Sequence, residues 1–223
     1  MIWQDQGFLL SISKYNENSA IADFFTNNHG KVSGVIFGAT SKKNKSYLLI
    51  GNNFHLNFNS KNDGKIGYFN IEINEILTPL YFEDKRKLFC IIYVMNLVKI
   101  LTADHQENKD IYSLIRNLFI SFKEDEWLRN FIFWELNLYK SLGYDINFKN
   151  YVKNINLDGK AKFITQSTNK IIPDFLINKD SSSDNKDIID GFKLLGDYLD
   201  KTILKPNNIN FPLSRIEFGN LIK

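Results

Sequence analysis

The first third of the chain alternates apolar and polar residues with a period of two. Leu10 and Ile12 alternate with serines, and Phe54, Leu56 and Phe58 alternate with polar residues. Such alternation is typical of β-strands that bury one face. The pattern predicts five strands, at about 7–15, 19–26, 31–38, 47–60 and around Phe69, Ile71 and Ile73.

Turn residues separate these strands at short intervals. Residues 26–30 read Thr-Asn-Asn-His-Gly, and residues 62–65 read Asn-Asp-Gly-Lys, a sequence typical of hairpin turns. Gly34 lies inside the third strand, where we expect a bulge or a sharp bend. Residues 39–46 are expected to form a polar, basic loop. Together these features predict a five-stranded OB-like barrel over residues 1–80, although an SH3-like barrel would show a similar pattern.

From Pro79 onward the apolar residues recur with the period of helices. Gly143 is expected to end one helix as a C-cap, and the polar residues 180–185 are placed to cap another. Residues 146–186 form an irregular insert, with weak strand character only around 162–165. Helices are predicted at about 87–101, 109–122, 125–142, 187–204 and 212–222. The sequence therefore predicts an α+β protein whose barrel is followed by a mainly helical domain over residues 81–223.

Positive charge is concentrated in the barrel. The whole chain carries a formal net charge of +3, whereas residues 31–65 contain six lysines and a single acid, Asp63, which leaves −2 for the rest. A basic surface on a nearly neutral molecule is what phosphate binding requires. A solvated loop rich in lysine is the simpler alternative. The candidate DNA contacts are Lys31, Lys42, Lys43, Lys45, Lys61 and Lys65.

Aromatic residues are interleaved with these lysines. Single-stranded nucleic acid is held by a cationic groove and by aromatic faces on which bases stack. The candidates for stacking are Phe37, Tyr47, Phe58 and Tyr68. Phe37 and Phe58 are predicted to belong to the core, because they lie in strands. Tyr47, next to the basic loop, is the aromatic residue that we favour.

The sequence offers no catalytic constellation. The one cysteine, Cys90, lies in an apolar run and is expected to be buried, and the three histidines have no metal-ligand spacing. Glu135 is a lone helical carboxylate, which favours a structural role. We find no nucleotide-binding or nucleophile motif, no secretory signal and no apolar run long enough for a membrane span. The sequence therefore predicts a cytoplasmic protein that is not an enzyme and holds no metal or cofactor.

Several fragments, in the right order along the chain, resemble one family. They include the turn Thr-Asn-Asn-His-Gly-Lys, the strand Gly-Val-Ile-Phe-Gly with its basic loop, the helix ending in Leu-Gly-Tyr, and a Ser-Arg pair near the C-terminus. The matching positions are 3–10, 15–21, 26–31, 34–43, 134–144 and 212–215. These fragments resemble RecO proteins of bacterial recombinational DNA repair, of the alphaproteobacterial type.

The resemblance implies an OB-fold followed by a helical domain. It also implies a nucleoid-associated mediator that binds and anneals single- and double-stranded DNA. With RecR, such a mediator helps to load RecA onto strands covered by single-strand-binding protein, and neither a membrane nor a small-molecule substrate is involved. The positions of Lys31, Lys42 and Lys43 match the family's basic turn and loop. Many relatives carry four zinc-binding cysteines at the stretch equivalent to 150–175, which here contains none, so no zinc is expected.

Two other functions are compatible with the sequence. The barrel and helices could form an adaptor between proteins, in which the lysines only increase solubility. An unrecognised nuclease is the third possibility, although no carboxylate cluster points to one.

Overall fold

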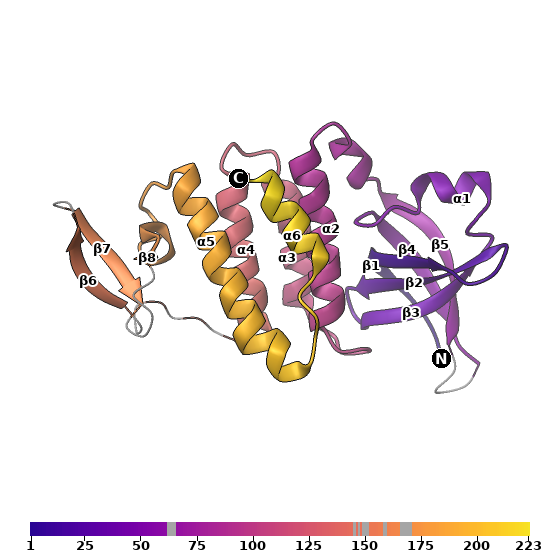
Figure 1. Cartoon of the computed structure of the whole chain (residues 1–223). Helices are drawn as coiled ribbons and strands as arrows, with labels where there is room; N and C mark the ends of the chain where they lie inside the picture. The colour runs from indigo at the N-terminus through magenta and orange to yellow at the C-terminus, as the bar shows by residue number, and fades with distance from the viewer. Residues whose placement is uncertain (62–65, 145, 147, 149–151, 158–159, 166–170) are drawn as a thin grey trace. The chain divides into compact units, whose positions relative to one another are not determined.

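The structure is a computed structural model that describes the chain except residues 62–65, 145, 147, 149–151, 158–159 and 166–170. Of residues 152–157 and 160–165 it describes the backbone alone. The chain forms two compact units (Figure 1), residues 1–116 with 212–221 and residues 117–211 with 222–223. The predicted boundary near residue 80 therefore separates the barrel from the helices but does not coincide with the division between units.

The first unit contains a closed five-stranded barrel in the order β1-β2-β3-β5-β4. Neighbouring strands are antiparallel except β3 and β5, which pair in parallel and close the barrel. This order, with a helix between β3 and β4, confirms the predicted OB-like barrel. The strands are β1 (Ile2–Lys14), β2 (Ser19–Thr26), β3 (Gly30–Phe37), β4 (Asn53–Asn59) and β5 (Gly67–Glu75).

The barrel interior is filled by the apolar residues of the alternating pattern. Phe24, Phe54 and Phe69 are fully buried and meet edge to face, with Phe24 5.6 Å from Phe54 and 5.0 Å from Phe69 between ring centroids. A Cβ atom at Gly34 would lie 2.5 Å from the Phe69 ring. Gly34 is therefore required for close packing. The predicted bulge there is wrong, because β2 and β3 pair without a register shift, and the alternative of a sharp bend stays a prediction. The register shifts lie instead in β1 at Leu9 and in β4 next to Phe54.

The predicted basic loop is in part a short helix, α1 (Lys42–Tyr47), so the fourth strand begins at Asn53 and not at Tyr47. Gly38 has φ +70°, which turns the chain sharply out of β3. The Ser41 side chain then caps α1 by accepting a hydrogen bond from the Asn44 backbone. A helix of six residues with a polar cap is too short to show a period, which explains why the sequence pattern predicts only a loop.

Helix α2 (Lys85–Leu101) packs on the barrel and is buried as predicted, with Cys90 in its core-facing surface. Lys99 joins it to β2 through an ion pair with Asp23, 2.7 Å between Nζ and Oδ2. Burial works to raise the pKa of Asp23. The hydrogen bonds that it accepts from Lys99, Ser11 and Ser33 outweigh burial, so this pKa lies below the usual value.

The C-terminal helix α6 (Leu213–Leu221) returns to the first unit and packs along α2. Asn96 donates to the Ser214 hydroxyl at 3.0 Å. Arg215 is buried over the Tyr93 ring, 5.2 Å from its centroid, and donates to the Tyr93 hydroxyl. The Ser-Arg pair near the C-terminus is therefore a structural link between distant parts of the chain.

The second unit is built on α4 (Trp127–Ser141), α5 (Asn185–Tyr198) and the last residues of α3 (Lys109–Ser121). Asp184 begins α5 with a capping box and Gly143 follows α4 with φ +89°, which confirms both predicted caps. Glu135 is buried in α4 and accepts from the Tyr139 hydroxyl, in agreement with the predicted structural role. Residues 199–204 continue α5 as a π-helical stretch.

The predicted irregular insert contains a small antiparallel sheet in the order β6-β7-β8. The strands are β6 (Val152–Leu157), β7 (Lys160–Thr165) and β8 (Ile171–Ile172). The weak strand pattern at 162–165 thus marks the centre of a sheet, and the expectation of an irregular segment is wrong for these residues. Within the described part of the chain, no helix has the length and apolar character to span a bilayer, and no cluster of His, Cys, Asp and Glu could hold a metal ion.

Candidate nucleic-acid interface

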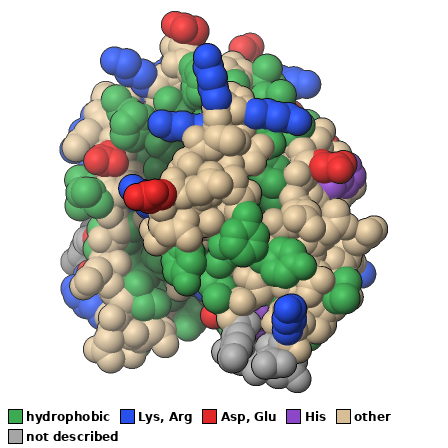
Figure 2. All heavy atoms as spheres, turned by 90° about the vertical axis from the view of Figure 1, so that its right-hand side faces the viewer, with side chains coloured by type: hydrophobic (Ala, Val, Ile, Leu, Met, Phe, Trp, Pro, Cys, Tyr) green, Lys and Arg blue, Asp and Glu red, His purple; other side chains and the backbone are tan. Residues whose placement is uncertain are grey.

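Lys42, Lys43 and Lys45 all lie on α1, and all three are exposed. Their ammonium groups form no ion pair with any residue that the structure describes. Figure 2 views the barrel side of the molecule and shows Lys and Arg side chains along the upper part of this face, with Asp and Glu side chains among them, above an area of hydrophobic side chains. Three adjacent cations without carboxylate partners provide the electrostatic basis of an anion-binding surface.

Lys61 is a further cation at a different part of the barrel, because it follows the end of β4 that pairs with Ile2 at the start of β1, away from α1 (Figure 1). It is exposed directly after β4, and the Met1 ammonium donates to the Ser60 carbonyl at 2.6 Å, so a second positive charge lies close by. Asn59, at the end of β4, pairs with Tyr68 of β5, which contacts Phe37 at the end of β3. Lys65 lies outside the described residues.

Lys14 is a further candidate that the sequence analysis missed. It is the last residue of β1, is exposed, and pairs with Ala20, which in turn pairs with Ile36 at the end of β3. The concentration of lysines in residues 31–65 would have pointed to Lys14 if it had been extended to the neighbouring β1–β2 turn. That turn also brings one exposed acid, Glu17, whose carbonyl accepts from Thr40 at 3.0 Å. We call the group Lys14, Lys42, Lys43 and Lys45 the lysine end of the barrel, and Lys61 is a separate cation beside the start of β1.

Lys31 does not belong to the lysine end. It lies at the opposite end of β3, and its ammonium donates to the carbonyls of Lys99 and Thr102 at 2.8 and 2.6 Å. Asp104 adds an ion pair at 3.3 Å, and the Lys31 side chain is only 16% exposed. The ammonium therefore caps the C-terminus of α2, where positive charge is favourable. The structure therefore gives this ammonium a role within the fold, and Lys31 as a DNA contact stays a prediction.

The structure buries and exposes the aromatic candidates differently from the prediction. Phe58 is buried at 4% exposure, which confirms its predicted core role. Tyr47 is half-buried: its ring lies 6.2 Å from Phe54 and its hydroxyl donates to Asn44, so the aromatic residue that the sequence favours packs against the core. Phe37 is 62% exposed, and the prediction that it belongs to the core is wrong.

The exposure of Phe37 follows from the parity of β3. Val32 and Ile36 point into the barrel, and because side chains alternate along a strand, Phe37 points outward. It contacts Tyr68, with ring centroids 5.8 Å apart and the rings inclined by 53°. Two aromatic rings therefore lie side by side on the outer surface at the lysine end.

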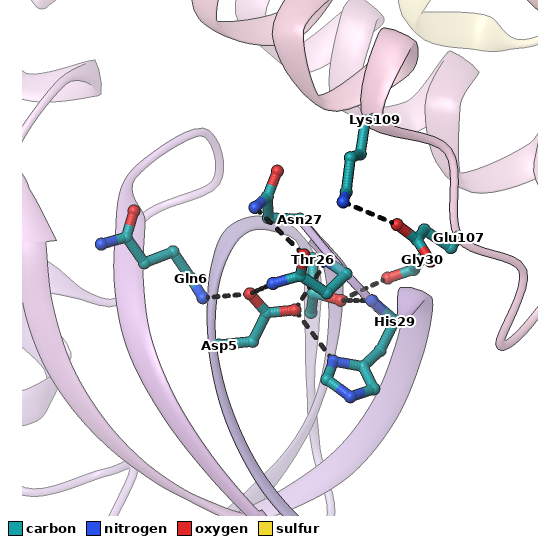
Figure 3. Close-up of polar contacts among 9 residues, drawn as sticks. Asp5, Gln6, Thr26, Asn27, His29, Gly30, Glu107 and Lys109 are labelled. Atoms are coloured by element: carbon teal, nitrogen blue, oxygen red, sulfur yellow. Dashed lines mark hydrogen bonds and ion pairs between the residues drawn. The ribbon is translucent and has the colours of Figure 1, made fainter.

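A polar clamp fixes the β2–β3 turn (Figure 3). The carboxylate of Asp5 is 3% exposed and contacts the Nδ1 atom of His29 at 2.9 Å. It also accepts two hydrogen bonds from Asn28, through the backbone at 2.8 Å and the side chain at 2.9 Å. The His29 ring stacks on Trp3, with centroids 4.0 Å apart. His29 is therefore part of the architecture of the turn.

A polar groove of about 750 Å³ crosses β1, β4 and β5 beside this clamp. Among the described residues, its lining contains Gln4, Gln6, His55 and Asn57, together with the carboxylate of Glu72, and no lysine or arginine. A groove with this charge distribution does not attract phosphates. The phosphate-binding surface must therefore be sought at the lysine end.

Comparison with known proteins gives consistent matches along the chain. Residues 1–76 match the family model described as "Recombination protein O N terminal", and residues 83–188 match the one described as "Recombination protein O C terminal". A "DNA repair protein RecO" of Ehrlichia chaffeensis is 28% identical over 175 residues, covering 77% of this chain and 70% of the relative. Proteins with the same description from Rickettsia typhi and Rhodospirillum centenum are 29% and 20% identical, covering 80% and 98% of this chain and 81% and 93% of their own lengths.

Proposed function

Because this chain belongs to the RecO family of DNA repair and recombination proteins, we propose that it binds DNA without sequence specificity through the lysine end of its barrel. The observation that carries the proposal is the arrangement of four exposed lysines at one end of an OB-type barrel, unpaired with any described carboxylate. Lysine ammonium groups that neutralise phosphates release counterions, which provides affinity for any DNA sequence.

The finer function that we propose is strand annealing and recombinase loading. The chain would bring complementary strands together and, with RecR, help RecA to replace single-strand-binding protein. The family resemblance supports this role and an association with the nucleoid. It equally supports a role without catalysis, which is tested by incubating an end-labelled strand with the protein and Mg²⁺. An intact strand is expected, and cleavage would instead support a nuclease.

Annealing of two complementary strands coated with single-strand-binding protein, without ATP, tests the proposal. The wild-type chain is expected to accelerate annealing, and the triple variant Lys42→Glu, Lys43→Glu, Lys45→Glu is expected to lose this effect. The matched control reverses the exposed lysines of the second unit, Lys123, Lys179 and Lys186, and so has the same net charge. A site at the lysine end predicts that this control anneals like the wild type.

The alternative is a non-catalytic adaptor in which the barrel has no direct role with DNA. It predicts that both triple variants retain partner binding and that the wild-type chain has little affinity for DNA. Equal loss of annealing in both triple variants would show that overall charge, and not the lysine end, carries the effect.

A further inference from the structure

The aromatic pair formed by Phe37 and Tyr68 has no role in the folded core. Phe37 is 62% exposed at the end of β3, and its ring lies beside that of Tyr68. Single exposed apolar residues are common, but these two belong to a larger apolar area. Ile66 precedes β5, and Ile2 pairs with Asn59, the partner of Tyr68; both isoleucines are exposed.

The surroundings of this pair favour a polyanion over an apolar partner. The Gly38 carbonyl, which directly follows Phe37, accepts from the Asn44 side chain of α1 at 3.0 Å, so the helix that carries Lys42, Lys43 and Lys45 lies beside the pair. Figure 2 shows the same association of hydrophobic side chains with cationic ones on this face. Cations beside exposed aromatic rings complement a chain that has both phosphates and flat apolar bases.

We propose that Phe37 and Tyr68 form a base-stacking site, so that the lysine end holds single-stranded DNA by its bases as well as by its phosphates. This inference rests on the proposed DNA binding and adds the form of the substrate. The two rings are inclined by 53° with centroids 5.8 Å apart, and because Phe37 is 62% exposed while Tyr68 is partly buried, Phe37 provides the main stacking surface. Bases in a duplex are already stacked on one another, so the aromatic pair contributes only when the strand is single.

An abasic oligonucleotide separates the bases from the phosphates. Fluorescence anisotropy is measured with a labelled thymidine strand of about 12 nucleotides, within the site sizes of OB folds, and with a strand of equal length that lacks bases. The wild-type chain is expected to bind the thymidine strand about 5- to 150-fold more tightly, equivalent to about 1–3 kcal/mol for one stacked base. Phe37→Ala is expected to remove most of this difference while leaving duplex and abasic binding unchanged.

Further variants distinguish stacking from general apolar contact. Phe37→Trp keeps an aromatic face and is expected to retain the preference, whereas Phe37→Leu keeps apolar surface alone and is expected to lose it. The matched control is Phe82→Ala, because Phe82 is similarly exposed, at 52%, but lies before α2. Thermal unfolding of Phe37→Ala should equal that of the wild type, since the side chain is not in the core.

The possible results separate base stacking from DNA binding itself. Equal affinity of the wild type for the two strands, or an equal loss of both in Phe37→Ala, would overturn base stacking while leaving DNA binding intact. If Phe37→Ala instead abolished binding of a protein partner, with strand affinities unchanged, the aromatic pair would be a protein-docking surface and the inference would be wrong. Absence of binding to all three DNA probes would refute the proposed function itself.

Discussion

Replacement of Lys31 by Met distinguishes a structural lysine from a DNA contact. The substitution keeps the length and the apolar stem of the side chain but removes the ammonium group. In the structure that group donates to the Lys99 and Thr102 carbonyls at the end of α2. The variant leaves these helix-terminal acceptors without their charged donor, so we expect a loss of stability and no direct effect on DNA binding.

The size of the loss follows from the two hydrogen bonds. Each bond from a charged donor contributes about 1.5–3 kcal/mol, and part of this is recovered when water replaces the ammonium. The ion pair adds little, because Asp104 is 65% exposed. We therefore expect Lys31→Met to lower the free energy of unfolding by about 2–4 kcal/mol, equivalent to a fall of about 5–15 °C in the unfolding temperature.

The assay combines urea unfolding with the salt dependence of DNA binding. Lys45→Met is the matched control, because the same substitution is made at an exposed, unpaired lysine of α1. Lys45→Met should change stability by less than about 0.5 kcal/mol and reduce the salt slope by about 0.7, whereas Lys31→Met should leave the slope unchanged. Unchanged stability of Lys31→Met together with a reduced slope would refute the structural assignment and restore Lys31 as a phosphate contact.

Three further substitutions test the first unit. The hydrogen bonds to Asp23 hold its pKa below the usual value, so the stabilisation that they provide is complete above about pH 4 and is lost as the pH falls through the folded pKa. Asp23→Asn should therefore be less stable at pH 7, and its free energy of unfolding in urea should fall less steeply at acidic pH than that of the wild type. An unchanged fall at acidic pH would disprove the link to Lys99. Gly34→Ala should lower the unfolding free energy by about 1–3 kcal/mol, since its methyl group meets the Phe69 ring, and wild-type stability would show that the ring moves aside at no cost. Asp5→Ala should accelerate amide hydrogen exchange in the β2–β3 turn selectively, and uniform exchange across the barrel would argue against a local clamp.

The barrel was predictable because its pattern is local. Phe54, Leu56 and Phe58 alternate with polar residues, and this period alone fixes which face is buried. The alternation of side chains along β3 also predicts that Phe37 is exposed, since Val32 and Ile36 point to the opposite face of the strand. The apolar character of Phe37 suggested a core residue, but its position along the strand determines whether its side chain is buried or exposed.

Other parts of the site depend on contacts that a sequence does not display. Lys31 is bound by carbonyls 68 and 71 residues away, so nothing near it in the chain distinguishes it from Lys42. The clamp on the β2–β3 turn likewise joins His29 to Asp5 across 24 residues. Charge density along the chain therefore located the basic region, whereas the fold decided which of its lysines remain free.

The salt dependence of single-strand binding tests the central claim most directly. Four or five lysines that neutralise phosphates predict a slope of log K against log salt of about −3 to −3.5 for the wild type. The variant with Lys42, Lys43 and Lys45 replaced by Glu should bind more weakly with a slope of about −0.7 to −1.4, while reversal of Lys123, Lys179 and Lys186 should leave the slope at its wild-type value. A wild-type affinity that is independent of salt, or the same slope in all three proteins, would contradict the assignment of DNA binding to the lysine end.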